Sequence, residues 1–365
     1  DPLVVLQFGD YQAATGSWPE QLDGAEIAAK AINAAGGVNG RQIKVISCNS
    51  KGDVNEGAKC ARDGVSGGAI EAVGSQQLNS QGSTKVFEAS SMANVGNNPL
   101  APVDFTSASS FPIVPGAATA VAAACAGLVE QDGIKSNVVV FGVDLAAGKT
   151  ARDACQKSLD LRGVKSTVVV APPGAPDMAP FVAQAMAQKP KAVVLSVLPS
   201  DIVKIATAFH QAGFTGRYAS VISLYSAALA PQLAPTTDGA LLGAKLPPPA
   251  DASSSGLEQF RADAKKYGGN APLTEYSMDS YISVHVVAEV AKTMTGPITP
   301  ASFLKAMQAA SNVKVPILGT LNFTTSAGIE GQPRLTNARA VLVRFEGGAF
   351  KTLGKFFDPY EVGKN

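Results

Sequence analysis

The residues from Ser75 to Ser80, Ser-Gln-Gln-Leu-Asn-Ser, form the most polar loop between two regular segments of the chain. The loop follows an apolar segment that ends at Gly74 and opens a segment with helical spacing. The first turn of a helix presents unpaired backbone N–H groups and the positive end of its dipole, which suit a carboxylate. We therefore expect this loop to bind an anionic group of a small molecule. An ordinary helix N-cap is the alternative, and the two roles are compatible.

Other polar loops also lie between an apolar segment and a helical one. Ligands of parallel α/β sheets bind at the carboxyl ends of the strands, where such loops lie. One loop runs from Tyr11 to Pro19, another is Gly96-Asn97-Asn98, and three more follow strands later in the chain. Five of these polar loops, including Ser75–Ser80, lie beyond the loop 11–19 in the chain. Their ligand-binding candidates are Gln76, Gln77, Asn79, Gly96, Asn97, Asp144, Leu198, Ser223 and Tyr225.

The elements that position these loops are short apolar strands alternating with amphipathic helices. In the helix expected over 20–35, Ile27, Ala31 and Ile32 recur at helical spacing. Gly36 can end this helix in the left-handed conformation with little steric cost, because it has no Cβ atom. The strands expected over 137–142 and 191–198 are continuous apolar runs, as in strands covered on both faces. The alternation predicts an α/β fold with parallel sheets and helices on both faces.

The chain is long enough for two domains, since it has 365 residues. Two stretches, Asp104–Pro115 and Gly239–Pro249, interrupt the alternation and are rich in Ser or Pro, which is typical of crossings between lobes. The tail beyond residue 319 alternates like antiparallel strands, with a hairpin turn expected near Gly347-Gly348. A chain that returns to its first lobe after completing a second would have this order.

The four cysteines indicate an exported protein. Pairing of sequence neighbours, Cys48 with Cys60 and Cys125 with Cys155, would close short loops. Each disulfide would contribute about 3 kcal/mol in the loop-entropy model. Four buried free thiols are the alternative, but the even count and the local pairing favour disulfides.

Composition and charge exclude several classes of function. The net charge is +1 and no run of five basic residues occurs, so a nucleic acid is not an expected partner. No stretch approaches the roughly 18 apolar residues of a membrane span. Zinc-ligand spacing is absent, and we expect neither a metal nor a cofactor.

The start at Asp1-Pro2, without Met, is expected of a processed form whose signal segment is absent from this chain.

Four segments in one order, together with the Gly9 loop, carry a family resemblance. They read "GAEIAAKAINAAGGVNGRQIKV", "EAVGSQQLNSQG", "AVVLSVLPSDIVKIATAFHQAGFTGRY" and "YSMDSYISVHVVAEV". Together they resemble the type I periplasmic binding proteins, in the branch that binds leucine, isoleucine, valine and related ligands. The N-A-A-G-G-V-N-G block is the most specific part.

The resemblance implies two Rossmann-like lobes joined by three crossover segments. The first lobe would comprise 1–116 and 246–332, and the second 117–245 and 333–365. Such proteins are monomers that capture a small solute outside the cytoplasmic membrane, in the periplasm or as lipoproteins, and deliver it to an ABC permease. The expected ligand is a small carboxylate, an amino acid or a related acid or amide, clasped by hinge closure.

The resemblance also assigns roles to particular residues. Trp18 stands in the loop where similar proteins place an aromatic wall, and Tyr276 and Asp279 match the late helix whose start reaches the family's binding cleft. Amino-acid binders usually hold the ligand ammonium with an acid after the strand that corresponds to 218–222. This chain has Ser223 and Tyr225 there instead, so Asp144 or Asp279 would have to substitute, or the ligand lacks an amine.

The sequence contains one match to an enzyme motif, but the elements expected around it do not fit that motif. Gly64-Val65-Ser66-Gly67-Gly68 matches G-x-S-x-G, but the serine ends a helix instead of following a strand. No dinucleotide or P-loop motif follows the first strand. We therefore expect a non-enzymatic solute receptor. The alternatives are the sensory module of a signalling receptor, and an enzyme built on the same fold.

Overall fold

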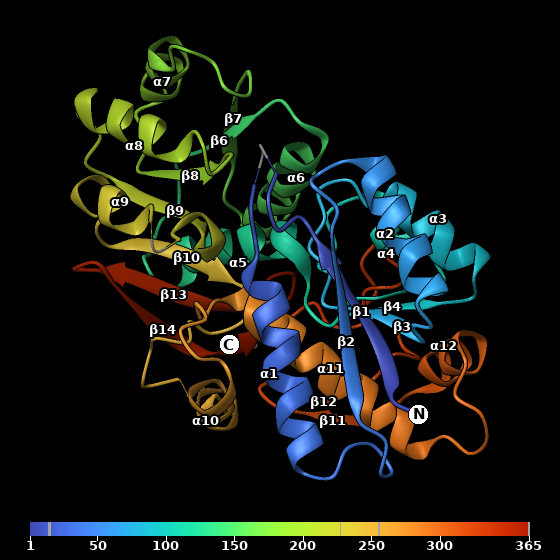
Figure 1. Ribbon diagram of the computed structural model, residues 1–365. Helices are drawn as coiled ribbons and strands as arrows, with labels where there is room; N and C mark the ends of the chain where they lie inside the picture. Colours follow the sequence, from blue (N-terminus) through green and yellow to red (C-terminus); the bar gives the residue numbers. More distant parts are fainter. Residues whose placement is uncertain (14–15, 227, 255, 364–365) are drawn as a thin grey trace. The chain divides into compact units, whose positions relative to one another are not determined.

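The computed structural model describes residues 1–13, 16–226, 228–254 and 256–363. The chain divides into two compact units (Figure 1). Unit 1 comprises Asp1–Val114 and Ser254–Asn337, and unit 2 comprises Pro115–Ser253 and Ala338–Asn365. The chain thus passes between the units three times, after residues 114, 253 and 337, whereas the sequence predicts lobe limits at 116, 245 and 332.

Unit 1 is built on a five-stranded parallel sheet with the order β2-β1-β3-β4-β5. Helices α2 and α3 pack against one face of the sheet, while α1 and α11 lie side by side (Figure 1). A small antiparallel pair, β11 with β12, completes the unit. The elements are β1 (Leu3–Gly9), α1 (Glu20–Ala34), β2 (Ile43–Asn49), α2 (Val54–Ser66), β3 (Glu71–Val73), α3 (Gln81–Ala89), β4 (Ala93–Val95), α4 (Pro102–Thr106), β5 (Ser110–Phe111), α10 (Glu258–Tyr267), α11 (Glu275–Thr293), α12 (Pro300–Ala309), β11 (Val313–Val315) and β12 (Gly319–Leu321).

The packing of α1 against α11 explains why its sequence is rich in small residues. A Cβ atom at Gly24 would lie 1.9 Å from the Ser277 carbonyl oxygen, so the two helices approach at backbone distance. Ile27 and Ile32 are buried on the inner face of α1. Gly36, with φ of +104°, takes the conformation that ends the helix, as the sequence predicts.

Unit 2 is built on a seven-stranded sheet with the order β14-β13-β10-β9-β8-β6-β7. The strands from β10 to β7 are parallel, and β13 and β14 add an antiparallel hairpin at one edge. The elements are α5 (Gly116–Glu130), β6 (Val138–Val143), α6 (Ala146–Leu161), β7 (Ser166–Ala171), α7 (Ala179–Met186), β8 (Ala192–Ser196), α8 (Ile202–Gln211), β9 (Arg217–Val221), the 3-10 turn η1 (Ile222–Leu224), α9 (Ala230–Thr237), β10 (Ala240–Ala244), β13 (Ala340–Glu346) and β14 (Ala349–Phe357).

The core of unit 2 follows from its apolar strands. Phe141 and Phe209 meet edge to face, with ring centroids 5.4 Å apart. The alanine-rich helix α5 is buried along most of its length, as its composition predicts. It lies so close to β10 that a Cβ atom at Gly243 would come within 1.8 Å of the Ala120 carbonyl oxygen.

The fold class and most elements agree with the sequence prediction, and two helices were missed. The alternating helices and parallel strands, and the hairpin at Gly347-Gly348, are confirmed. Helix α9 was not predicted because Pro231 and Pro235 interrupt its helical pattern, although the first stands at the helix start. The five-residue α4 overlaps the start of the stretch 104–115, which the sequence predicts as a crossing between lobes without a helix.

Both predicted disulfides are present. Cys48 of β2 is bonded to Cys60 of α2, and Cys125 of α5 is bonded to Cys155 of α6. The pairs are 12 and 30 residues apart in sequence. The first bond joins two consecutive elements of unit 1, and the second joins two helices of unit 2 that are separated in the chain by β6. The pairing of sequence neighbours that the sequence predicts is therefore confirmed.

A partly buried histidine makes the stability of unit 1 depend on pH. Burial lowers the pKa of His285, on α11, to about 4, against a smaller opposing effect of Asp263 and Glu289. Its imidazole packs on the Tyr281 ring at a centroid distance of 4.6 Å. Because the folded pKa lies below the unfolded value, the neutral form stabilises the fold above about pH 6.5, and this contribution is lost as the pH falls towards 4.

We expect the free energy of unfolding of the wild type to fall by up to about 3 kcal/mol between pH 7 and pH 4 through this group. The variant His285→Gln should lose that part of the pH dependence. Urea titrations of both proteins at several pH values measure the difference. Identical pH slopes would show that His285 titrates normally in the folded protein.

Candidate functional site

The strand order of unit 1 creates a topological switch point between β1 and β3. After β1 the chain forms β2 on one side, and then β3 on the other side of β1. Open α/β sheets bind ligands outside the carboxyl ends of the strands at such a point. The two strands end at Gly9 and Val73, so the loops that begin with Asp10 and Gly74 border the switch point.

Polar side chains that are almost fully buried occupy these loops and their neighbours. Buried polar groups are costly unless they are hydrogen-bonded, so a cluster of them needs a dedicated network. Each of the following is at most 5% exposed: Asp10, Gln21, Ser50, Ser75, Gln76, Gln77, Ser80, Asn94, Asn97 and Asn98.

Asp10 joins three loops of this site through its carboxylate. One oxygen accepts hydrogen bonds from the Ser50 hydroxyl at 2.6 Å and the Gly52 amide at 2.8 Å. The other oxygen accepts from the Leu78 amide at 2.8 Å. Charge-assisted bonds of this kind are the stronger ones in proteins. The first loop of the sheet is thereby tied both to the β2–α2 loop and to the β3–α3 loop.

Gln21 makes a second connection, from the first turn of α1. Its Oε1 accepts from the Gln76 amide at 2.9 Å and from the Gln7 side chain at 3.0 Å. Its Nε2 donates to the Trp18 carbonyl at 2.8 Å. Asp10 and Gln21 were both missed from the sequence. The available signal for Asp10 was a carboxylate directly after a buried strand.

The predicted residues of the Ser75–Ser80 loop take different directions. The Gln76 side chain accepts from Asn98, within the site. The Gln77 Oε1 accepts from the Ser83 hydroxyl at 2.7 Å, and its Nε2 lies against α2, near Gly57. Asn79 is exposed, and its amide donates to the Gly52 carbonyl at 2.7 Å. Asn79 therefore stabilises the neighbouring β2–α2 loop.

Gly96 and Asn97 follow β4 at the same edge of the sheet. Asn97 donates to the Ser110 hydroxyl at 2.8 Å. Gly96 has φ of +68°, and a Cβ atom there would lie 1.7 Å from Ser283 Oγ on α11. Only glycine fits this position, because it alone permits both the backbone conformation and the close approach of the helix.

We expect Gly96→Ala to lower the free energy of unfolding by about 2–3 kcal/mol, from a left-handed alanine and the displacement of α11. Gly40→Ala is the matched control, since Gly40 has φ of +80° but no atom lies within 4 Å of the place that a Cβ would take. The control should cost only about 1 kcal/mol. If urea denaturation gave the same loss of unfolding free energy for both variants, the displacement of α11 would cost nothing.

Two aromatic rings meet beside the switch point. Trp18 and Tyr276 have ring centroids 5.7 Å apart at an interplanar angle of 52°. Tyr276 lies in the first turn of α11, which Thr274 caps. The Ser280 hydroxyl donates to the Gly74 carbonyl at 3.0 Å, so this end of α11 lies at the carboxyl end of β3. Asp279, also on α11, is 2% exposed.

The predicted residues of unit 2 are more scattered. Asp144 is exposed directly after β6, and Ser223 is half-buried in η1. The Leu198 carbonyl accepts from the amides of Asp201 and Ile202, where α8 begins. Asp144 and Leu198 thus follow the neighbouring strands β6 and β8.

Tyr225 lies in the core of unit 2. It is 2% exposed, and its ring centroid is 5.0 Å from that of Phe345. Its hydroxyl donates to Thr237 Oγ1 at 3.1 Å, and burial raises the pKa of Tyr225 to about 12. The turn η1 directs this ring inward, which gives it a packing role.

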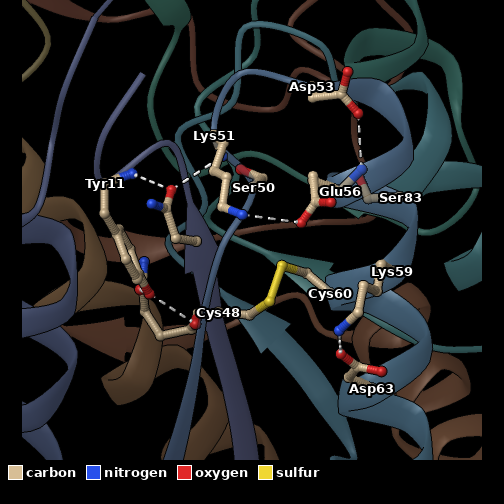
Figure 2. The surroundings of a disulfide bond; sticks show 12 residues. Tyr11, Cys48, Ser50, Lys51, Asp53, Glu56, Lys59, Cys60, Asp63 and Ser83 are labelled. Carbon is tan, nitrogen blue, oxygen red and sulfur yellow. Dashed lines mark hydrogen bonds and ion pairs between the residues drawn. A yellow bond between two sulfur atoms is a disulfide. The ribbon is translucent and has the colours of Figure 1, made fainter. Parts of the chain in front are cut away.

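The Cys48–Cys60 disulfide joins β2 to α2 beside the β2–α2 loop (Figure 2). Ser50 and Gly52 of this loop donate to Asp10. Cys48 lies at the end of β2, two residues before Ser50. The ion pair between Lys51 and Glu56, at 3.5 Å, joins the loop to α2. The disulfide and this ion pair both tie the chain at the end of β2 to α2.

No three His, Cys, Asp or Glu residues of the described part of the chain are grouped so as to hold a metal ion. Among its helices, none combines the length and the apolar character that a membrane crossing requires.

Comparison with known proteins identifies relatives of the same fold. The leucine binding protein of Thermotoga maritima is 16% identical, with a TM-score of 0.78 over 98% of this chain and 99% of that one. A possible leucine/isoleucine/valine-binding protein of Rhodopirellula baltica is 14% identical, with a TM-score of 0.79 over 96% of each chain. A fatty acid ABC transporter substrate-binding protein of Thermomonospora curvata is 15% identical, with a TM-score of 0.77 over 98% of this chain and 93% of that one.

A sequence search of curated proteins found no match. The model of the periplasmic binding protein family matches residues 9–341, which is most of the chain. The resemblance deduced from the sequence blocks is therefore confirmed. The chain belongs to the periplasmic binding protein family, whose members bind solutes outside the cytoplasm and are not enzymes.

Proposed function

We propose that this protein is the substrate-binding protein of an ABC importer and captures a small carboxylate-bearing solute by hinge closure between two lobes. The observation that carries the proposal is the buried, cross-linked polar cluster at the switch point of unit 1, centred on Asp10 and Gln21. A network that fixes several loops before any solute arrives reduces the ordering cost of binding.

The solute would contact residues from both units. In unit 1, Trp18 and Tyr276 offer apolar ring surface, while Gln76, Asn97 and Asp279 offer polar groups. In unit 2, the loops after β6 and β8 contribute the second wall, with Asp144 and Leu198 at their start. Closure would follow from a higher affinity of the solute for the closed form.

The class of solute follows from the relatives and from the chain. Relatives of this fold are named for leucine and for fatty acids, which share a carboxylate on an apolar body. No acid stands among residues 222–225, where amino-acid binders hold the ammonium, so an acid or amide without an amine fits this chain as well as an amino acid. The closed form would be presented to a membrane permease by a periplasmic or lipid-anchored monomer.

A ligand screen followed by thermal unfolding and fluorescence tests the function. Trp18 is the only tryptophan, so its emission reports on the loop beside the switch point. At one hundred times its Kd, a solute stabilises the protein by about 2.7 kcal/mol, which raises Tm by several degrees. Amino acids, aliphatic acids, aromatic acids and their amides form the panel.

We expect at least one solute to raise Tm and to change the Trp18 emission. Tyr276→Ala should weaken that solute about tenfold or more, since a well-packed aromatic contact contributes over 1 kcal/mol. Tyr225→Phe is the control, because it removes only a hydroxyl from the core and should leave Kd unchanged. A panel in which no solute affects Tm or emission would contradict the proposed function.

A further inference from the structure

Unit 2 has its own topological switch point, between β6 and β8. After β6 the chain forms β7 on one side, and then β8 on the other side of β6. The two strands end at Val143 and Ser196, and the ligand-binding position in such a sheet is outside these ends. The residue of interest there is Arg152, which lies in the second turn of α6.

Arg152 reaches back from α6 to the end of β6. Its Nη1 donates to the Val143 carbonyl at 2.6 Å, and the residue is 6% exposed. Two glycines make room for it. A Cβ atom at Gly142 would lie 2.8 Å from Nη1, and one at Gly148 would lie 3.1 Å from it. The backbone around the switch point is thus shaped to the guanidinium.

The charge of Arg152 has no counterpart in the described part of unit 2. No carboxylate of those residues lies within ion-pair distance of it, and its one hydrogen bond to them goes to Val143. A guanidinium has five N–H donors, and a buried charge is costly unless it is paired.

Two other arginines of unit 2, both partly buried, have an acid partner. Arg162, at the opposite end of α6, pairs with Glu130 at 2.6 Å, and its side chain is 2% exposed. Arg344 makes two parallel bonds to Asp132, at 2.6 Å and 3.0 Å. Arg152 differs from both, and it is the one that lies at the switch point.

The matching position of unit 1 is arranged the opposite way. The backbone amides of Gly52 and Leu78, which would suit a ligand carboxylate, already donate to Asp10 of the chain itself. Asp10 is fully buried, so these donors are occupied by a fixed anion. A second anion beside Asp10 would be repelled, since like charges within a few ångströms disfavour each other.

We propose that Arg152 is the anchor for the solute carboxylate, and that this group binds at the switch point of unit 2 instead of at the Ser75–Ser80 loop. The proposal rests on the proposed function and deepens it, because it names the charged residue that selects an acid. A planar guanidinium matches a carboxylate with two parallel N–H donors, whereas a neutral amide has no charge to pair with it.

The test uses full-length protein freed of bound solute by unfolding and refolding with both disulfides intact. The probes are acid and amide pairs: leucine and leucinamide, hexanoate and hexanamide, benzoate and benzamide. Thermal unfolding finds the binders and calorimetry gives their Kd. We expect an acid to bind the wild type while its amide does not, and Arg152→Gln to weaken that acid by about 30-fold or more.

Arg162→Gln is the matched control, since it removes an arginine at the other end of the same helix. It should lower the Tm of the solute-free protein by several degrees, because the bonds of Arg162 to Glu130 and to the Pro359 carbonyl are lost. It should leave the Kd of the acid within about threefold. Arg152→Gln should keep or raise the Tm of the solute-free protein, since it removes an unpaired buried charge.

Four results would overturn the assignment of Arg152 as the anchor. An unchanged Kd in Arg152→Gln, or equal binding of acid and amide, rejects the anchor and leaves the solute receptor standing. A Tm loss in solute-free Arg152→Gln as large as in Arg162→Gln assigns Arg152 a structural role. If no acid or amide binds the wild type, the proposed function fails, and the anchor fails with it.

Discussion

Replacing Asp10 by alanine is expected to lower the free energy of unfolding of unit 1 by about 3–5 kcal/mol. The Ser50 hydroxyl and the amides of Gly52 and Leu78 would lose their acceptor, and each unsatisfied buried donor costs about 1–3 kcal/mol. Urea denaturation followed by Trp18 emission measures this loss, because the tryptophan belongs to unit 1. Solute affinity should fall as well, since three loops of the site are no longer tied together.

Two further variants serve as comparisons for Asp10→Ala. Asp10→Asn keeps one acceptor oxygen but turns an amide nitrogen towards backbone donors, so we expect an intermediate loss. Asp144→Ala removes the acid that follows β6 directly in unit 2, and because that acid is exposed its effect should stay within about 0.5 kcal/mol. A small loss for Asp10→Ala would show that water replaces the carboxylate without cost.

Removal of the Cys125–Cys155 disulfide is the second large effect. The double variant Cys125→Ala with Cys155→Ala should lose about 4 kcal/mol of unfolding free energy, because the bond closes a loop of 30 residues. Removing Cys48–Cys60 in the same way should lose about 3 kcal/mol, since its loop spans 12 residues. Both cysteines of the longer loop are fully buried, so alanine leaves no polar group in the core.

Urea denaturation of the two double variants, each followed by far-UV circular dichroism, gives both losses. Trp18 emission separates them, since the Cys48–Cys60 variant should destabilise unit 1 and the Cys125–Cys155 variant unit 2. Solute affinity should fall further in the Cys48–Cys60 variant, because the β2–α2 loop that it supports donates to Asp10. If removal of Cys48–Cys60 cost more unfolding free energy than removal of Cys125–Cys155, the loop-entropy model of disulfide stabilisation would be wrong for this protein.

Local patterns alone predicted the alternation of elements. The spacing of Ile27, Ala28 and Ile32 defines one face of α1, and Gly36 ends that helix, because both effects act within a few residues. Both disulfides could be proposed for a similar reason, since each joins cysteines that are neighbours in the sequence, 12 and 30 residues apart. Helix α9 was missed where prolines obscure the local pattern.

The polar loops after strands could also be proposed from the sequence, and the structure brings Gln76, Gly96 and Asn97 to one edge of the sheet in unit 1. The direction of each side chain could not be proposed. Asn79 turns to the Gly52 carbonyl and Tyr225 turns into the core, because each responds to a partner far away in the chain or across a turn.

The sequence by itself determined the fold class, the disulfide pairs and the loops in which a site could form. Only the tertiary structure decided that Asp10 fills the donors of one switch point and that Arg152 lies unpaired with acid at the other, among the described residues. The reason is physical. A switch point is a property of strand order, and strand order arises from pairing between segments whose local patterns are nearly the same.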